Sequence, residues 1–187
     1  MTVKLDNHQL LYVSMPKCAS TSLKHMFYRF EHGHDFVPGS AKGNAKKGIH
    51  NLSPARLRAA LIDSQVTRYF KLTIVRDPIK RLISAYTNKV VNQRLLYESH
   101  SAKILADAGL STHPDFETFI EHFEVYQAAN VSIFHHTRPA VDFIGYDPLF
   151  FDRIYSLFEL STLVSDLEAR LGTSLTLGQH QTSHSHW

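Results

Sequence analysis

A short apolar run in this chain is followed at once by a lysine and a cluster of small and hydroxyl-bearing residues. The run is LLYVS (residues 10–14), and it leads into MPKCASTSL (residues 15–23). Apolar side chains then recur at the spacing of one helix face, at Leu23, Met26, Phe27 and Phe30. The pattern predicts a buried strand, a loop, and a helix that begins near Thr21.

The loop between the predicted strand and helix has the chemistry of an anion site. Such a loop presents unpaired backbone N–H groups and the positive end of the helix dipole. Ser20, Thr21 and Ser22 add hydroxyl donors and Lys17 adds a full charge, so the segment suits a phosphate or sulfate group. An ordinary Ser/Thr cap beside a surface lysine is the alternative. The loop is not of the Walker A type, because the lysine comes first and glycine is absent.

A second segment of the same kind lies at residues 69–86, YFKLTIVRDPIKRLISAY. Its first seven residues predict a strand, and Asp77 and Pro78 predict the cap and first turn of the next helix. Arg76 ends the strand and Ser84 lies two turns into the helix. Since the planar fork of arginine binds phosphate oxygens bidentately, Arg76 and Ser84 could hold a second phosphate. The alternative is a solvated helix face with a structural Arg76–Asp77 pair.

Strands alternate with helices along the chain, which favours an α/β fold around a parallel sheet, with ligands at the carboxyl ends of the strands. We expect further helices after Pro54 and Pro114, a strand at residues 153–160, and a helix from Ser161 or Thr162 to Gly172. The helix after Pro78 should bury an apolar stripe made of Ile79, Leu82, Ile83, Tyr86 and Val90. The length of 187 residues fits one domain, with residues 92–150 as a largely helical elaboration.

Composition indicates the class of ligand and the cellular compartment. A net charge of only +3, with 13 His in reserve, suits a small anion better than a nucleic-acid track. The single cysteine, Cys18, excludes an intramolecular disulfide and favours a reducing compartment. We find neither a signal peptide nor a membrane span. The expectation is therefore a cytoplasmic location, with a trimmed lumenal domain as the alternative.

Cys18 also invites a reading as a nucleophile, because it precedes a helix N-terminus. Nothing nearby in the sequence has the character of a dedicated base, so this reading ranks low. The C-terminal His180, His184 and His186 could bind a metal ion, but histidines spaced like this in a polar tail are more often solvated. We therefore expect no metal.

Three segments together resemble the sulfotransferases. MPKCASTSLKHMF (residues 15–27) resembles their 5′-phosphosulfate loop, and FKLTIVRDPIKRLISAY (residues 70–86) resembles their 3′-phosphate motif. The stretch FHHTRPAVDFIGYDPLFFDRIYSLFEL (residues 134–160) is similar to the H-x-R-P-Q…D-x-I-x-x-x-E region of the carbohydrate (family 2) sulfotransferases. The resemblance covers about residues 10–172, although Ala140 stands where relatives usually carry Gln.

The resemblance implies a P-loop-like three-layer sandwich, with helices on both sides of a central parallel sheet. It also implies transfer of a sulfuryl group from 3′-phosphoadenosine 5′-phosphosulfate to an acceptor hydroxyl. Lys17 would neutralise charge on the leaving 5′-phosphate. The donor would be bound by the loop residues Lys17, Ala19, Ser20, Thr21 and Ser22, and its 3′-phosphate by Arg76 and Ser84.

The same resemblance implies which residue acts as the general base. KKGIHNLSPARL (residues 46–57) resembles the family segment K-x-H-L-P-x-x-L, whose His is the base. His50 is therefore the candidate that would take the proton of the attacking hydroxyl, a task suited to a His that is neutral near pH 7. His135 and His136 are the runners-up. They and Arg138, which could grip an acidic sugar, lie in the region that lines the acceptor site in relatives, so residues 92–150 would be the acceptor side.

Two other functions stay open. A phosphotransferase would need Mg²⁺ and a carboxylate to hold it, and Asp77 is the obvious candidate, although its place before Pro78 suits a cap. A binding module for an acidic polysaccharide could use the Lys and His side chains of residues 33–50, but it would leave Arg76 and Ser84 unexplained. The family favours a carbohydrate hydroxyl as acceptor, with a lipid or a small metabolite as alternatives.

Overall fold

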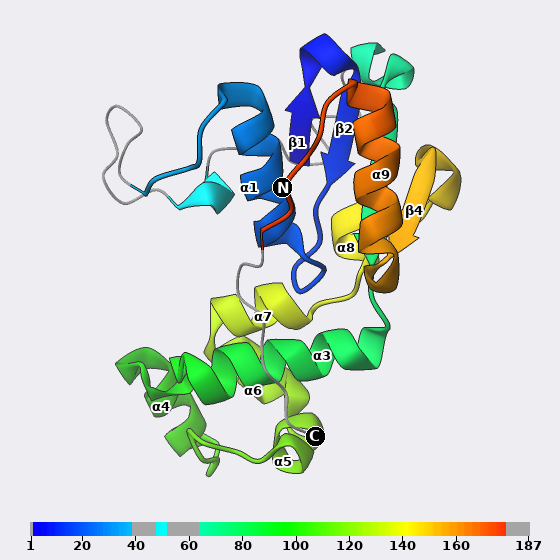
Figure 1. The fold of residues 1–187 in the computed structure, drawn as a ribbon. Helices are drawn as coiled ribbons and strands as arrows, with labels where there is room; N and C mark the ends of the chain where they lie inside the picture. The colour runs from blue at the N-terminus through cyan, green and yellow to red at the C-terminus, as the bar shows by residue number, and fades with distance from the viewer. Residues whose placement is uncertain (1, 39–47, 52–63, 179–187) are drawn as a thin grey trace. The chain divides into compact units, whose positions relative to one another are not determined.

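The structure is a computed structural model that describes residues 2–38, 48–51 and 64–178 (Figure 1). It divides into two compact units. The first contains the described residues up to Arg76 and from Ala140 onward, and the second is Asp77–Pro139. Each unit has its own apolar core and is described by itself.

The first unit is built on a four-stranded sheet in the order β1-β2-β3-β4. The strands are β1 (Thr2–Leu5), β2 (Leu10–Val13), β3 (Phe70–Val75) and β4 (Arg153–Ser156). β2, β3 and β4 run parallel, whereas β1 pairs antiparallel with β2. The α/β class is thus confirmed, and the sheet is mixed rather than wholly parallel. β1 was not predicted, because TVKL alternates polar and apolar residues over only four positions, too few to be distinguished from a polar end.

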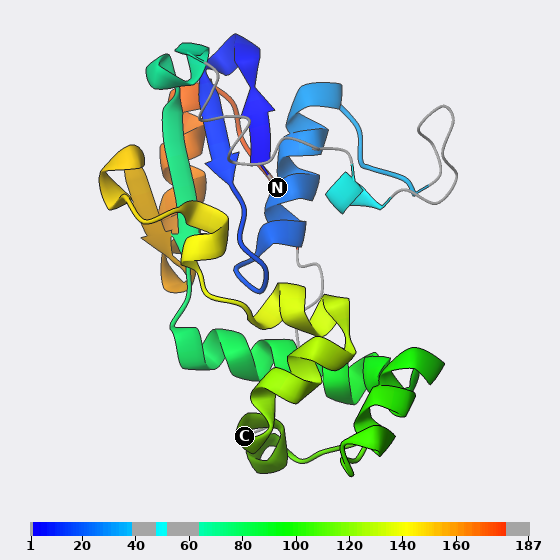
Figure 2. The same ribbon diagram turned by 180° about the vertical axis from the view of Figure 1, so that it is seen from behind.

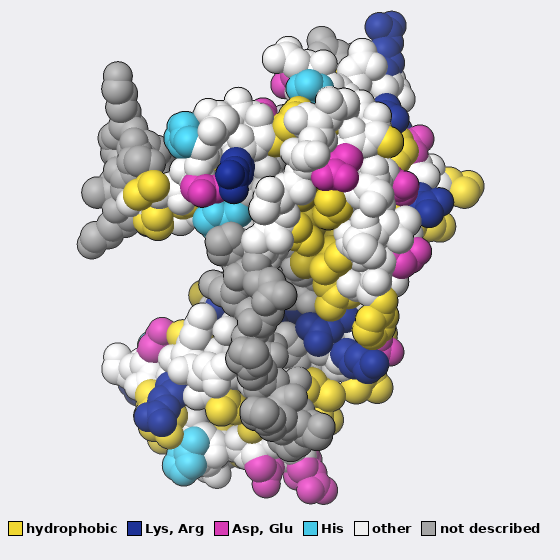
Figure 3. All heavy atoms as spheres, in the orientation of Figure 1, with side chains coloured by type: hydrophobic (Ala, Val, Ile, Leu, Met, Phe, Trp, Pro, Cys, Tyr) yellow, Lys and Arg dark blue, Asp and Glu magenta, His cyan; other side chains and the backbone are white. Residues whose placement is uncertain are grey.

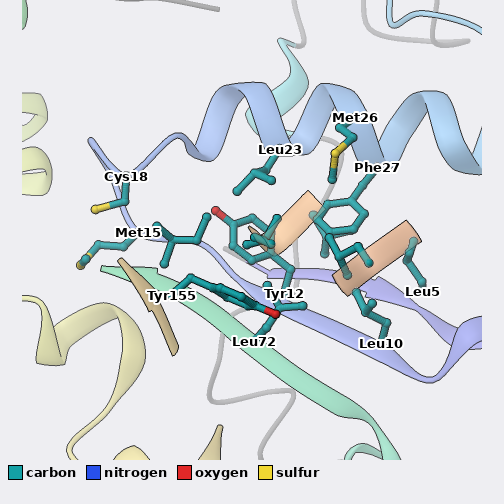
Figure 4. Packing of buried hydrophobic residues seen from close by; sticks show 14 of the residues in the cluster. Leu5, Leu10, Tyr12, Met15, Cys18, Leu23, Met26, Phe27, Leu72 and Tyr155 are labelled. Carbon is teal, nitrogen blue, oxygen red and sulfur yellow. The ribbon is translucent and has the colours of Figure 1, made fainter. Parts of the chain in front are cut away.

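Alternate residues of β2 face two different cores. Leu10 and Tyr12 belong to the larger cluster, in which α1 (Ser20–His32) and α9 (Leu160–Leu171) pack against the sheet. Figure 4 shows Leu23, Met26 and Phe27 reaching from α1 toward Tyr12. Leu11 and Val13 face the smaller cluster, which is completed by Val66, Tyr69 and Phe151. Burial on both faces fixes β2 and the start of α1, and hence the loop between them.

Short helical turns complete the first unit. They are η1 (Asp6–His8), η2 (Ile49–Asn51), η3 (Ser64–Arg68), α8 (Val141–Ile144), η6 (Pro148–Phe150) and η7 (Leu157–Glu159). Figure 2 shows the sheet from behind, with α1 and α9 beside it. The helix that we expected after Pro54 lies outside the described residues.

The second unit is helical. It comprises α3 (Pro78–Tyr86), the π-helical turn η4 (Thr87–Asn92), η5 (Leu95–Tyr97), α4 (Ser99–Asp107), α5 (Phe116–Glu121), α6 (Phe123–Ala129) and α7 (Val131–Thr137). Its core is aromatic and is centred on Phe119 and Tyr126. Asp77 caps α3 as predicted, because its side chain accepts a hydrogen bond from the Lys80 backbone N–H at 2.8 Å.

Two details of the predicted helices are wrong. Ile79, expected in the core stripe of α3, is 64% exposed, whereas Arg81 and Ser84 are buried. The reason is that α3 packs against α7, whose terminal carbonyl groups need a donor. The helical segment that ends in α9 begins before Ser161, because Ser156 and Glu159 form a capping box that starts the first turn there.

Candidate active site

The loop between β2 and α1 has a strained backbone. Lys17 has φ 68° and Ala19 has φ 54°, both in the left-handed region that non-glycine residues rarely adopt. Such strain is held in place by the surrounding structure and clusters at functional sites. Here the neighbouring Cys18 is fully buried in the larger core and anchors the loop between the two strained residues.

Ala19 is the N-cap residue of α1, and its methyl group makes no capping hydrogen bond. The reading of the Ser/Thr cluster as an ordinary cap is therefore wrong, because no hydroxyl occupies the N-cap position. Ser20, Thr21 and Ser22 form the first turn of α1 instead. Their hydroxyl groups thus stand with the first N–H groups of the helix, which is the donor set that an anion needs.

Cys18 does not behave as a nucleophile in this structure. Its side chain is 0% exposed and packs in the larger core with Met15 and Leu23. A buried thiol in an apolar setting acts as a small hydrophobic side chain. The role of Cys18 is to hold the loop.

Arg76 joins the two motifs of the first unit. Its Nη1 atom donates a hydrogen bond to the backbone carbonyl of Lys17 at 3.3 Å. The contact follows from topology, because β2 and β3 are parallel neighbours, with Val13 in register with Thr73. Their carboxyl ends therefore meet at the same edge, and Arg76 at the end of β3 contacts the loop that leads into α1.

His50 lies against that turn. Its Nε2 atom is 3.1 Å from the Thr21 hydroxyl, and its Nδ1 atom is 3.3 Å from the Lys24 ammonium nitrogen. The residue predicted as the base and a residue predicted to bind the donor are thus in contact. His50 lies on η2, a short turn that packs against α1.

Lys24 was missed by the sequence reasoning. It is 3% exposed, and burial lowers the pKa of its ammonium group to about 8. One signal was available, because Lys24 follows Thr21 by three residues and therefore lies on the same side of the helix. A lysine so placed beside apolar neighbours indicates a partner across the helix surface.

The second unit gathers the remaining predicted residues around α7. Ser84 is 5% exposed on α3. Arg81, also on α3, donates to the backbone carbonyls of His136 at 3.2 Å, of Thr137 at 3.5 Å, and of Arg138. The guanidinium thereby satisfies the carbonyl groups left unpaired at the end of a helix. The sequence analysis did not single out Arg81 and missed this role.

Both histidines of α7 lie near its end, with ring centroids 5.1 Å apart. The Nδ1 atom of His136 is 2.8 Å from the Ser132 carbonyl oxygen. Since a carbonyl can only accept, Nδ1 carries the proton and the neutral ring presents Nε2 as an acceptor. His136 therefore has the geometry of an oriented imidazole, which keeps it in contention as the base.

Asp77 and three C-terminal histidines were considered as possible metal ligands. Asp77, the carboxylate considered for Mg²⁺, is engaged as the cap of α3. Within residues 2–38, 48–51 and 64–178, no three or more His, Cys, Asp and Glu side chains gather as a metal site would require. His180, His184 and His186 lie outside that part of the chain. Figure 3 shows both basic and acidic side chains on one face of the first unit.

The first unit is thus an α/β unit whose loop between β2 and α1 lies at the carboxyl ends of parallel strands, a position where α/β proteins commonly bind phosphate-bearing ligands. Comparison with known proteins makes the class more definite. A protein-family model described as "Sulfotransferase family" matches residues 2–174 of the sequence, so the chain belongs to the sulfotransferase family.

Curated relatives carry the comparison further. The chain is 32% identical to human carbohydrate sulfotransferase 14 over 120 residues, which are 62% of this chain and 31% of that protein. Carbohydrate sulfotransferase 10 is 32% identical in Homo sapiens and 33% in Gallus gallus, over 91 residues, or 46% of this chain and 25% of each relative. The resemblance to the carbohydrate sulfotransferases is confirmed. The chain covers less than a third of the length of these relatives, and no solved structure matches it significantly.

The comparison corrects one expectation. A cytoplasmic location is not supported, because the carbohydrate sulfotransferases to which the chain is similar are Golgi membrane enzymes. Among the helices of the described ranges, none has the length and apolar character needed to cross a bilayer.

Proposed function

We propose that this chain transfers a sulfuryl group from 3′-phosphoadenosine 5′-phosphosulfate to a hydroxyl of a carbohydrate acceptor. Membership of the sulfotransferase family and similarity to carbohydrate sulfotransferases support the reaction class and the acceptor. The observation that carries the proposal is the 3.1 Å contact between Thr21 and His50. It supports the proposal because His50, the proposed proton acceptor, lies against the first turn of α1.

In the proposed complex the 5′-phosphosulfate lies on the loop between β2 and α1. Lys17 offsets the charge that develops on the leaving phosphate, and the turn formed by Ala19, Ser20, Thr21 and Ser22 supplies N–H and hydroxyl donors. Arg76 is assigned to the 3′-phosphate, together with Ser84, which follows it by eight residues in the family motif. A bidentate guanidinium explains why an arginine is needed at the first of these positions.

Transfer proceeds by in-line displacement in this proposal. The acceptor oxygen forms a bond to sulfur while the bond from sulfur to the 5′-phosphate oxygen breaks, and His50 takes the hydroxyl proton. His135, His136 and Arg138 are assigned to the acceptor, with residues 92–150 as the acceptor side. Because a transferring sulfuryl group carries less charge than a phosphoryl group, Lys17 and the helix dipole can stabilise it without a metal ion.

Calorimetric titration with two nucleotides tests the donor assignment. Wild-type protein should bind 3′-phosphoadenosine 5′-phosphate about 10²-fold more tightly than adenosine 5′-phosphate, since a charge-assisted hydrogen bond contributes roughly 1.5–3 kcal/mol. Arg76→Ala should remove most of this difference, and Ser84→Ala should remove a smaller part. Arg29→Ala, a change of an exposed arginine that pairs with Asp35, is the control. Equal affinity of the wild type for both nucleotides would overturn the proposal.

A further inference from the structure

The contacts of His50 involve both of its ring nitrogens. Thr21 lies at Nε2 and Lys24 lies at Nδ1, at 3.1 Å and 3.3 Å. Thr21 and Lys24 are both on α1, so one helix contacts the ring on both of its nitrogen atoms. What these two side chains donate and accept therefore influences which ring nitrogen carries the proton.

A neutral imidazole has one N–H and one lone pair, on different nitrogens. The ammonium form of lysine can only donate, so it requires the lone pair at Nδ1 and leaves the proton on Nε2, directed at Thr21. The neutral amine form has a lone pair and can accept from Nδ1–H. In that case Nε2 holds the lone pair. The charge on Lys24 thus decides which nitrogen of His50 is able to take a proton.

We propose that Lys24 is a positioning residue that sets the tautomer of His50, and that His50 is competent as a base at Nε2 only while Lys24 is a neutral amine. This inference rests on the proposed function, in which His50 is the base. In the step itself the hydroxyl proton forms the Nε2–H bond and the ring becomes an imidazolium. Its Nδ1–H remains hydrogen-bonded to the Lys24 amine, while the acceptor oxygen bonds to sulfur and the 5′-phosphate leaves.

The surroundings of Lys24 make its amine form accessible. It is 3% exposed, and burial lowers its pKa to about 8, so roughly a tenth of the molecules carry the amine at pH 7. Within the described ranges, η2 and β1 lie against α1, and their titratable side chains are His50 and Lys4, whose ammonium pairs with Asp6 at 2.9 Å. On α1 itself, His25 is adjacent to Lys24 and Tyr28 follows Lys24 by one turn.

Two substitutions of opposite character test the inference through activity. Lys24→Gln replaces a titrating group with an amide that does not change its charge, so the rise of kcat/KM with a midpoint near pH 8 should disappear. In Lys24→Arg the charge is permanent, so kcat/KM at pH 9 should fall at least tenfold below the wild type. Unchanged affinity for 3′-phosphoadenosine 5′-phosphate serves as the control. Wild type and both variants with one common pH profile would overturn the inference.

Nitrogen-15 NMR of histidine-labelled protein provides a readout that needs no turnover. The His50 signals, assigned by their loss in His50→Gln, should show the proton on Nε2 at pH 7 and increasingly on Nδ1 above pH 8. In Lys24→Gln the position of the proton should not change with pH. A tautomer that ignores pH and Lys24 contradicts the inference, and the wild-type titration alone decides this if the variants do not fold. If the tautomer switches as expected while His50→Ala keeps full turnover, the tautomer assignment stands and the assignment of His50 as base fails.

Discussion

The side chain of Arg76 donates a hydrogen bond to the backbone carbonyl of Lys17, at 3.3 Å between Nη1 and the oxygen. The two residues are 59 positions apart and each follows a strand, β2 or β3. The bond ties the loop that carries Lys17 to the end of the neighbouring strand. A substitution at either position can therefore affect the geometry of the loop as well as its charge.

Lys17→Ala should lower kcat by about 10²-fold or more, because a charge partner of the leaving group is lost from the transition state. The Lys17 carbonyl that Arg76 contacts belongs to the backbone and remains, so the loop should keep its fold. Steady-state kinetics of the purified variant checks this. Lys103→Ala, on the exposed side of α4, is the matched control. Near-normal turnover of Lys17→Ala would assign the residue a structural role.

His50→Ala should reduce kcat by roughly 10²–10⁴-fold while the affinity for 3′-phosphoadenosine 5′-phosphate stays nearly the same, the profile of a lost general base. His135→Ala and His136→Ala should instead raise the KM of the acceptor. His136 is the sharper comparison, because its Nδ1 is fixed by the Ser132 carbonyl. If His136→Ala shows the loss of kcat and His50→Ala does not, the base is His136.

Arg81→Met should lower the free energy of unfolding by about 3 kcal/mol, since carbonyls at the end of α7 lose a charged donor in a buried place. Urea denaturation at pH 7 measures this. Arg29→Met removes only an exposed ion pair and should change stability by less than about 1 kcal/mol. Equal stability of the two variants would mean that the three carbonyls find other donors.

The buried Lys24 predicts a pH dependence of stability. Its pKa is about 8 in the folded protein against 10.5 for an ordinary lysine, so between these values the unfolded chain binds more protons than the folded one. The free energy of unfolding contributed by this group therefore rises with pH from about 8 to 10.5 and is lowest below 8. Lys24→Met should be more stable than the wild type at pH 7, with the difference shrinking toward pH 10.5 in thermal melts. A constant difference would contradict the shift.

Sulfuryl transfer should survive treatment with EDTA, because the proposed charge partners are Lys17 and the helix dipole, and Asp77 is engaged as a cap. Activity is measured with 3′-phosphoadenosine 5′-phosphosulfate before and after chelation. The same preparation is tested with ATP. Transfer from ATP that stops on chelation would indicate a phosphotransferase instead.

The strand and helix of each anion motif could be predicted because local signals agreed there. Val13 and Val75 end apolar runs, and Asp77 and Pro78 mark a helix start. The features that were missed depend on contacts between distant residues. Arg81 is buried because the end of α7 needs a donor, and no pattern around position 81 contains that information. Ile79 is exposed because the face of α3 that packs against α7 carries Arg81 and not Ile79.

Within the candidate site, too, features that depend on local sequence could be predicted, whereas contacts between distant residues could not. The chemistry of the loop could be inferred from Lys17 and Thr21, and family resemblance supplied His50. The pairing of His50 with Lys24 could not be inferred, because residues 24 and 50 meet only when η2 packs against α1. Sequence spacing reports neighbours along a helix and is silent about neighbours across a loop.

The left-handed backbone at Lys17 and Ala19 has a consequence for how this loop recognises an anion. The packing of Cys18 in the core holds these two residues in place, so in the proposed function the entropy of ordering the loop is lost mainly when the chain folds rather than when the nucleotide binds. Affinity and stability are therefore coupled at these two positions. Glycine at either position would relax the folded backbone and would also enlarge the unfolded ensemble. Because the folded loop would then sample more conformations, part of the entropy of ordering it would be lost on binding and not on folding.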